Sequence, residues 1–89
     1  MPGCEIIVSG RVQGVGFRWF VRDCAKRHDI TGYVRNMPDG TVLIIATGEF
    51  HNLDSFIPEI RQGNRLAVVR NMTVSELTNF TEYEDFVIA

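Results

Sequence analysis

Gly14, Gly16 and Arg18 lie close together in the segment 10–18, which reads Gly-Arg-Val-Gln-Gly-Val-Gly-Phe-Arg. Glycine permits left-handed backbone conformations that turn successive N–H groups toward one point, and Gly14 and Gly16 are separated by a single residue. A strand-like run precedes the segment and a helix-like run follows it, and helix N-termini attract anions. Arg18 adds a permanently charged, planar group that can bind two phosphate or carboxylate oxygens. The segment therefore predicts a phosphate-binding site.

An asparagine near the middle of the chain is the second residue to consider. Asn36 ends a strand-like run, directly before the turn sequence Pro38-Asp39-Gly40. Asparagine favours such positions for conformational reasons alone, so the position by itself does not assign a chemical role.

The first half of the chain contains the elements that must hold these residues. Residues 4–10 are rich in β-branched side chains and end at a glycine, which predicts a strand. Residues 30–36 and 41–47 predict a hairpin, and the second of these strands is apolar on both faces, as expected of a central strand. Between them, apolar residues recur with the spacing of an amphipathic helix of roughly three turns: Phe17, Phe20, Val21, Cys24 and Ala25, with His28 at the end of the same face.

The second half predicts a helix and two strands. Apolar residues at helical spacing span 53–60, and Gly63 is the expected end of this helix. Asn52 and Ser55 are rival N-caps, and Pro58 favours a start near Ser55 because proline is tolerated in the first turn. Residues 66–77 contain a further strand, and residues 86–88 form a short closing strand.

These elements follow one another in the order β-α-β-β-α-β, with a short strand at the end. The order predicts an α+β fold, a ferredoxin-like sandwich in which two helices cover one face of an antiparallel four-stranded sheet. The length of 89 residues suits one domain spanning 1–89. The fold hosts many functions and does not select one.

Two segments together resemble the acylphosphatase family. Residues 12–18 match the pattern V-Q-G-V-G-F-R, and residues 32–42 match G-[WY]-V-R-N-x-x-D-G-x-V, at the separation expected for the family. The resemblance is strongest over residues 6–48, and the length agrees with the small free-standing members. It implies hydrolysis of the carboxyl–phosphate bond of acyl phosphates, with no metal or other cofactor, and with inorganic phosphate as product and inhibitor.

The resemblance also implies roles for individual residues. Arg18 matches the arginine that binds the phosphoryl group, and Asn36 matches the asparagine that positions the attacking water. Thr41 matches a hydroxyl that supports the site from nearby. The backbone N–H groups that cradle the phosphate match those of Gln13, Gly14, Val15, Gly16, Phe17 and Arg18.

One departure from the family pattern lies after the second helix. Asn64 stands where many relatives have proline after the glycine. We expect this departure to affect only a loop and to leave the proposed site untouched.

Two other functions fit parts of the sequence. A non-catalytic module that binds phosphate or carbamoyl phosphate would keep the glycine loop, although it would not need Asn36. RNA-recognition modules share the element order, but they display aromatic residues on their central strands, and residues 5–9 and 41–46 contain none. The net charge of −2 also argues against a nucleic-acid partner.

The rest of the sequence bears on the location of the protein and on the state of its cysteines. No apolar run is long enough to cross a bilayer and no signal peptide is apparent, so we expect a cytoplasmic protein without a membrane partner. A monomer is the default expectation for a domain of this class. Cys4 and Cys24 are expected to be free thiols, and no Cys/His spacing suggests a metal site.

Overall fold

The computed structural model of the chain describes residues 1–78 and 81–89, which form five strands and two helices. In chain order the elements are β1 (Gly3–Arg11), α1 (Phe17–Arg27), β2 (Thr31–Asn36), β3 (Val42–Thr47), α2 (Phe50–Gln62), β4 (Val68–Glu76) and β5 (Phe86–Ile88). The predicted ferredoxin-like element order is confirmed, with the short terminal strand in addition. Within the described ranges, neither helix is long and apolar enough to cross a membrane.

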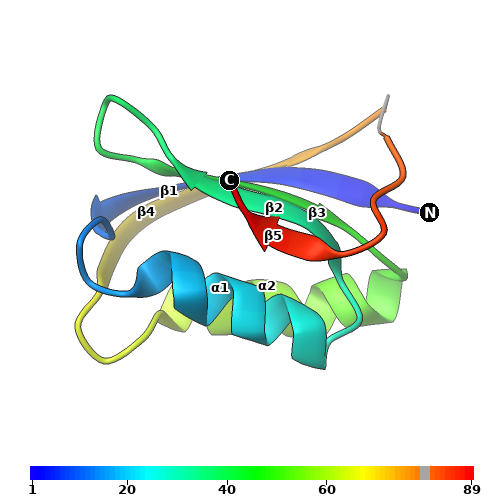
Figure 1. The fold of residues 1–89 in the computed structure, drawn as a ribbon, viewed down its shortest axis with the longest axis horizontal. Helices are drawn as coiled ribbons and strands as arrows, with labels where there is room; N and C mark the ends of the chain where they lie inside the picture. Colours follow the sequence, from blue (N-terminus) through cyan, green and yellow to red (C-terminus); the bar gives the residue numbers. More distant parts are fainter. Residues whose placement is uncertain (79–80) are drawn as a thin grey trace.

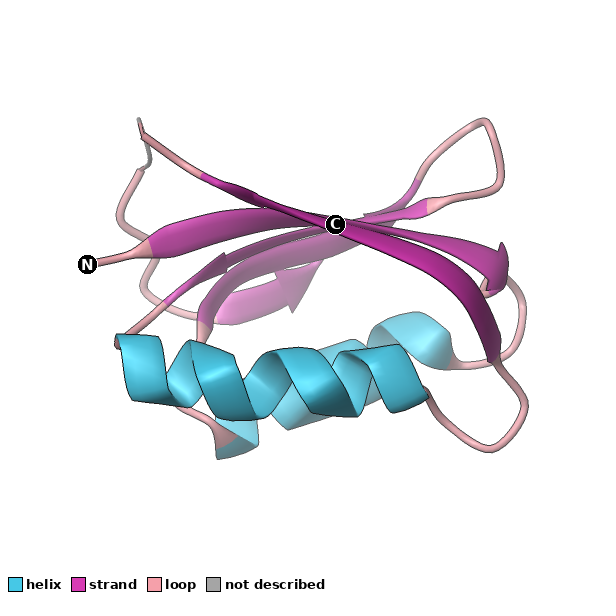
Figure 2. Ribbon diagram, turned by 180° about the vertical axis from the view of Figure 1, so that it is seen from behind, coloured by secondary structure: helices cyan, strands magenta, loops and turns pink. Residues whose placement is uncertain are grey.

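The five strands form one sheet in the order β4-β1-β3-β2-β5, and both helices pack against the same face of it (Figures 1 and 2). The four longer strands pair antiparallel, as predicted. β5 pairs in parallel with β2, so the complete sheet is mixed rather than purely antiparallel. Because β1 and β2 both run antiparallel to β3, their C-terminal ends meet at one end of the sheet, where α1 also begins.

The core lies between the sheet and the helices. Every second residue of a strand faces the helices, and those of the inner strands are almost completely buried: Ile6, Val8, Val34, Val42 and Ile44. The helices contribute the predicted apolar faces: Phe17, Val21, Cys24 and Ala25 from α1, with Leu53, Phe56 and Ile60 from α2. Full burial of a valine, leucine or phenylalanine side chain stabilises a fold by about 1.5–3 kcal/mol. This packing fixes α1 over the sheet and therefore fixes the position of its N-terminus.

The strand predicted to be central occupies the middle of the sheet. β3 lies between β1 and β2, and all six of its residues are buried. Leu43 and Ile45 are only 8% exposed although they face away from the helices. Their apolar character explains why the sequence of this strand shows no alternation.

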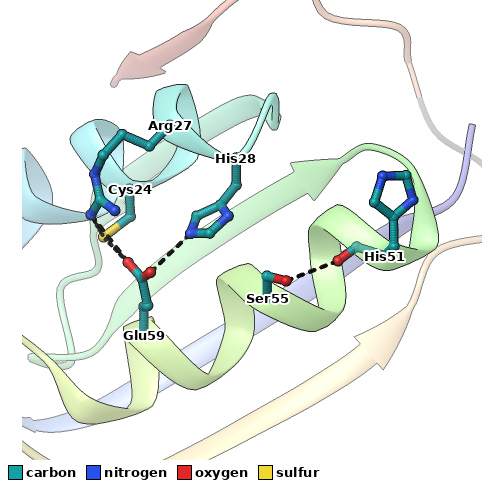
Figure 3. A network of polar contacts seen from close by, with 6 residues as sticks. All are labelled: Cys24, Arg27, His28, His51, Ser55 and Glu59. Carbon is teal, nitrogen blue, oxygen red and sulfur yellow. Dashed lines mark hydrogen bonds and ion pairs between the residues drawn. The ribbon is translucent and has the colours of Figure 1, made fainter.

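The start of α2 differs from the sequence prediction. The helix begins at Phe50, and neither Asn52 nor Ser55 caps it, because the N-cap position belongs to Glu49. The Ser55 hydroxyl instead donates a hydrogen bond of 3.2 Å to the carbonyl of His51, one turn earlier in the same helix (Figure 3). Serine often makes this bond within a helix, so its presence did not mark the helix start.

Pro58 lies inside α2 and not in its first turn. A proline there lacks the N–H that would donate to the residue four positions earlier, which costs about 3 kcal/mol in a helix interior. The burial of Leu53, Phe56 and Ile60 offsets this cost, since all three pack against the core while Pro58 is exposed. Gly63 ends the helix, as predicted.

A carboxylate from α2 joins the two helices. Glu59 accepts hydrogen bonds from the Cys24 thiol at 3.3 Å and from Nη2 of Arg27 at 3.1 Å. Its other oxygen lies 3.0 Å from Nε2 of His28, the half-buried residue that ends α1 (Figure 3). The hydrogen bonds from His28, then Cys24 and Arg27, lower the pKa of Glu59 to about 2.

We expect Glu59→Gln to lower the free energy of unfolding by about 1 kcal/mol at pH 6, since a half-exposed ion pair is screened by solvent. The pKa of Glu59 is lower in the folded chain than its ordinary value of 4.5. The stabilisation is therefore complete above pH 4.5 and is lost as the pH falls toward 2. Urea unfolding of the parent protein and of Glu59→Gln at pH 6 and pH 3 measures the difference in their free energies of unfolding. A stability difference that stayed constant or grew toward pH 3 would contradict it.

Both cysteines are free thiols, as predicted, and both are buried. Burial raises the pKa of Cys4 to about 11 and, with the hydrogen bond to Glu59, that of Cys24 to about 12. The reactive thiolate is therefore scarce at neutral pH, which indicates a packing role for both residues.

Candidate active site

The glycine loop runs from the end of β1 into the N-terminus of α1. Gly14 and Gly16 have φ angles of 73° and 77°, a left-handed conformation that favours glycine. Gly16 is the N-cap residue, and its carbonyl accepts the hydrogen bond from the N–H of Phe20 at 3.1 Å. The N–H groups of the helical residues before Phe20 have no acceptor within the helix. They are available to an anion, which the positive end of the helix dipole also attracts.

The side chain of Gln13 joins this loop to the β2–β3 hairpin. Its Nε2 donates to the carbonyl of Met37 and to the carbonyl of Thr41, each at 2.9 Å. The sequence assigned only the backbone N–H of Gln13 to phosphate binding. The two hydrogen bonds of its side chain were not predicted. The bridge fixes the loop beside the turn that follows Asn36.

Asn36 lies at the end of β2 on the helix-covered face of the sheet. It pairs with Val42 of β3, which pairs with Val8 of β1. Because Val34 faces the helices, Asn36, two residues further along the strand, faces the same way. Its Oδ1 atom is buried and has no hydrogen-bond partner within residues 1–78 and 81–89. An amide oxygen can accept a hydrogen bond from a water molecule there.

Thr41 lies directly before β3 and stabilises the hairpin. Its hydroxyl and its N–H both donate to Oδ1 of Asp39, at 2.6 and 3.0 Å. These two hydrogen bonds hold the pKa of Asp39 below its usual range, and the bond from the hydroxyl has the larger effect. The contact between Thr41 and the glycine loop is made by its carbonyl, through Gln13, while its hydroxyl is engaged by Asp39.

Arg18 is the second residue of α1 and is half buried. In the part of the chain that the structure describes, its guanidinium takes part in no ion pair. The other basic residues of the helix form ion pairs: Arg27 with Glu59, Lys26 with Asp85 at 3.4 Å, and Arg22 with Asp23 at 3.5 Å. The guanidinium of Arg22 also lies 4.4 Å from the centre of the Trp19 ring. No partner among the described residues neutralises the charge of Arg18, and the residue belongs to the first turn of α1.

Asn64 contacts the glycine loop, which corrects the expectation that this residue leaves the proposed site untouched. Its Nδ2 donates a hydrogen bond of 2.8 Å to the carbonyl of Val15. The two residues are 49 positions apart in the sequence. Periodicity and turn signals describe local structure only, so nothing in the sequence pointed to this contact.

All these segments meet at one end of the molecule. The glycine loop, the N-terminus of α1, the hairpin after β2 and the segment between α2 and β4 lie together at the left of Figure 1. The described residues contain no group of three or more histidine, cysteine, aspartate and glutamate side chains arranged to hold a metal ion. The chemical groups that the arrangement offers are backbone N–H donors, one guanidinium and amides, which suit a phosphorylated ligand.

Comparison with known proteins identifies relatives over almost the whole chain. The family model described as acylphosphatase matches residues 4–88. An acylphosphatase of Archaeoglobus fulgidus is 47% identical over 89 residues, which covers 100% of this chain and 99% of that protein. An acylphosphatase of Thermotoga maritima is 48% identical over 88 residues, covering 99% and 97%.

The same relationship extends to three dimensions. The crystal structure of acylphosphatase from Bacillus subtilis superposes with a TM-score of 0.96 at 38% identity, covering 100% of this chain and 99% of that one. The family model, the full-length relatives and the common fold agree, and the chain belongs to the acylphosphatase family.

Proposed function

We propose that this chain is an acylphosphatase that holds the phosphoryl group of its substrate with Arg18 and the glycine-loop N–H groups, and positions the attacking water with Asn36. The substrate is an acyl phosphate, and the products are a carboxylate and inorganic phosphate. The water oxygen forms a bond to phosphorus while the bond between phosphorus and the acyl oxygen breaks. The family relationship supports the reaction, and the arrangement around the glycine loop supports the residue roles.

The observation that carries the proposal is the bridge made by Gln13. Its two hydrogen bonds of 2.9 Å hold the phosphate-binding loop against the hairpin that begins just after Asn36. A loop that only bound phosphate would not need to be fixed to the residue that orients water. Positioning of this kind accounts for much of the rate enhancement of phosphoryl transfer, because the reaction depends more on aligning the attacking water with the phosphoryl group than on covalent catalysis.

The charges fit the same reaction. The phosphoryl group carries negative charge on its equatorial oxygens, and fixed N–H donors with one guanidinium stabilise that charge without reorganisation. A carboxylate is a good leaving group, so a strong general acid is unnecessary. The Asn36 amide is a poor base, and it acts by accepting a hydrogen bond from the water. The proton of the water passes to a phosphate oxygen of the substrate.

The product has the same chemistry as the group held in the cradle. Inorganic phosphate therefore binds the glycine loop and Arg18 and inhibits competitively. All groups of the proposed site come from one chain, so a monomer suffices for activity.

We expect purified protein to hydrolyse benzoyl phosphate at the same rate with and without excess EDTA, because the proposed site uses no metal. Release of benzoate and of inorganic phosphate, measured in parallel, follows the reaction. A rate that fell on chelation and returned with added Mg²⁺ would contradict the mechanism. A folded protein that bound phosphate but showed no turnover would identify a non-catalytic binding module instead.

A further inference from the structure

Asn64 holds one peptide group of the glycine loop from outside the loop. Its Nδ2 lies 2.8 Å from the carbonyl oxygen of Val15, between the two left-handed glycines. A carbonyl can only accept a hydrogen bond, so the nitrogen of the amide must be the atom facing it. A carbon added at Gly16 would lie 3.8 Å from the same nitrogen, which shows how closely the side chain approaches the loop.

Because the peptide bond is planar, the hydrogen bond from Asn64 to the Val15 carbonyl also sets the direction of the next N–H group. The carbonyl of Val15 and the N–H of Gly16 belong to one planar trans group, and they point in opposite directions. By holding the carbonyl, Asn64 directs the N–H of Gly16 away from itself. Neighbouring glycines leave this peptide group free to rotate, so without a partner it would sample several orientations.

The position of Asn64 is itself fixed by its surroundings. Gly63 ends α2 with a hydrogen bond to the carbonyl of Glu59, and the carbonyl of Asn64 accepts from the N–H of Ala67 at 3.2 Å. A side chain at Gly63 would come within 3.9 Å of the ring of Phe17, the first residue of α1. The helix end, the turn and the start of α1 therefore hold the amide beside the loop.

We propose that Asn64 is a positioning residue of the phosphate cradle, which orients the Val15–Gly16 peptide so that the N–H of Gly16 donates to the phosphoryl group. This inference rests on the proposed function, because it assigns a purpose to the orientation of that peptide. Asn64 touches neither phosphate nor water in this role. It acts through the backbone of the loop.

A purely structural role for Asn64 makes different predictions. A bond that only joined α2 to the loop would change the melting temperature and leave phosphate affinity as it was. A positioning role changes phosphate affinity and the environment of one particular backbone amide. The two roles are therefore separated by readouts other than stability.

The test uses Asn64→Leu, which removes the donor but keeps a side chain of four heavy atoms branched at Cγ, and Asn64→Ala, which removes most of the side chain. Asn71→Ala on β4 is the matched control, because Asn71 is exposed and outside the proposed site. For each protein we would measure the Ki of inorganic phosphate, kcat and KM for benzoyl phosphate, and the melting temperature. The amide resonance of ¹⁵N-labelled Gly16 would be followed through a phosphate titration.

Loss of one well-placed donor is expected to raise the Ki of phosphate roughly three- to tenfold in both variants and to leave the control unchanged. The Gly16 amide resonance should move in the unliganded variants and respond less to phosphate. A wild-type Ki and a wild-type Gly16 response in both variants, beside an active parent protein, would overturn this inference alone. A parent protein with neither phosphate binding nor turnover would overturn the proposed function and this inference with it.

Discussion

In the Arg18→Ala variant, kcat/KM for benzoyl phosphate is expected to fall by about a thousandfold or more, and inhibition by inorganic phosphate to be lost. Arginines that stabilise a transferring phosphoryl group contribute on the order of 10³–10⁵ to the rate. Arg18 has no competing ion-pair partner in the described part of the chain, so its charge is available to a ligand. The N–H groups of the loop alone cannot offset the desolvation of a phosphate dianion.

A second variant and a control make this expectation specific. Arg18→Lys keeps the charge but loses the planar fork, so it should recover only part of the lost activity. Arg61→Ala in α2 removes an exposed arginine of the same chain and should behave like the parent protein. An Arg18→Ala variant that was still inhibited by phosphate at the parent's Ki would exclude Arg18 from the binding of the phosphoryl group.

In the Asn36→Ala variant we expect kcat to fall by about 10²–10³, with the Ki of phosphate within a fewfold of that of the parent protein. Removing one preorganised polar group that acts in the transition state has an effect of this size. The prediction follows from the buried Oδ1 of Asn36, for which residues 1–78 and 81–89 supply no hydrogen-bond partner. Asn36 ends β2 on the helix-covered face, at the end of the sheet where β1 also ends. An effect confined to kcat marks an interaction used in the transition state.

Circular dichroism and the melting temperature of Asn36→Ala establish that the variant is folded. Asn52→Ala in α2 provides a control with the same change outside the proposed site. A raised KM at unchanged kcat would assign Asn36 to substrate binding, and the water would then need another partner.

Much of the fold could be predicted because local patterns and tertiary packing agree. The apolar face of α1, from Phe17 to Ala25, shows its period directly in the sequence, and it is the face that is buried. The uninterrupted apolar run of β3 indicated a central strand for the same reason. The segments that carry Arg18 and Asn36 were found through a motif, and the strand order places both at one end of the sheet.

Other features could not be predicted because distant contacts determine them. Pro58 indicated a later start for α2, but the burial of Leu53, Phe56 and Ile60 keeps the helix continuous through the proline. The sequence did not indicate which groups the side-chain amides of Gln13 and Asn64 contact. Their hydrogen bonds cross 24, 28 and 49 residues, so they exist only once the chain is folded.

These long-range hydrogen bonds connect ligand binding with the folding of the whole chain. The cradle is held from the hairpin by Gln13 and from the segment after α2 by Asn64, so it cannot persist when either region unfolds. If the loop binds phosphate as proposed, phosphate is a ligand of the native state alone, and we expect it to add about 2.7 kcal/mol to the global free energy of unfolding at a hundred times its Kd. We therefore expect the product of the proposed reaction to stabilise the enzyme as well.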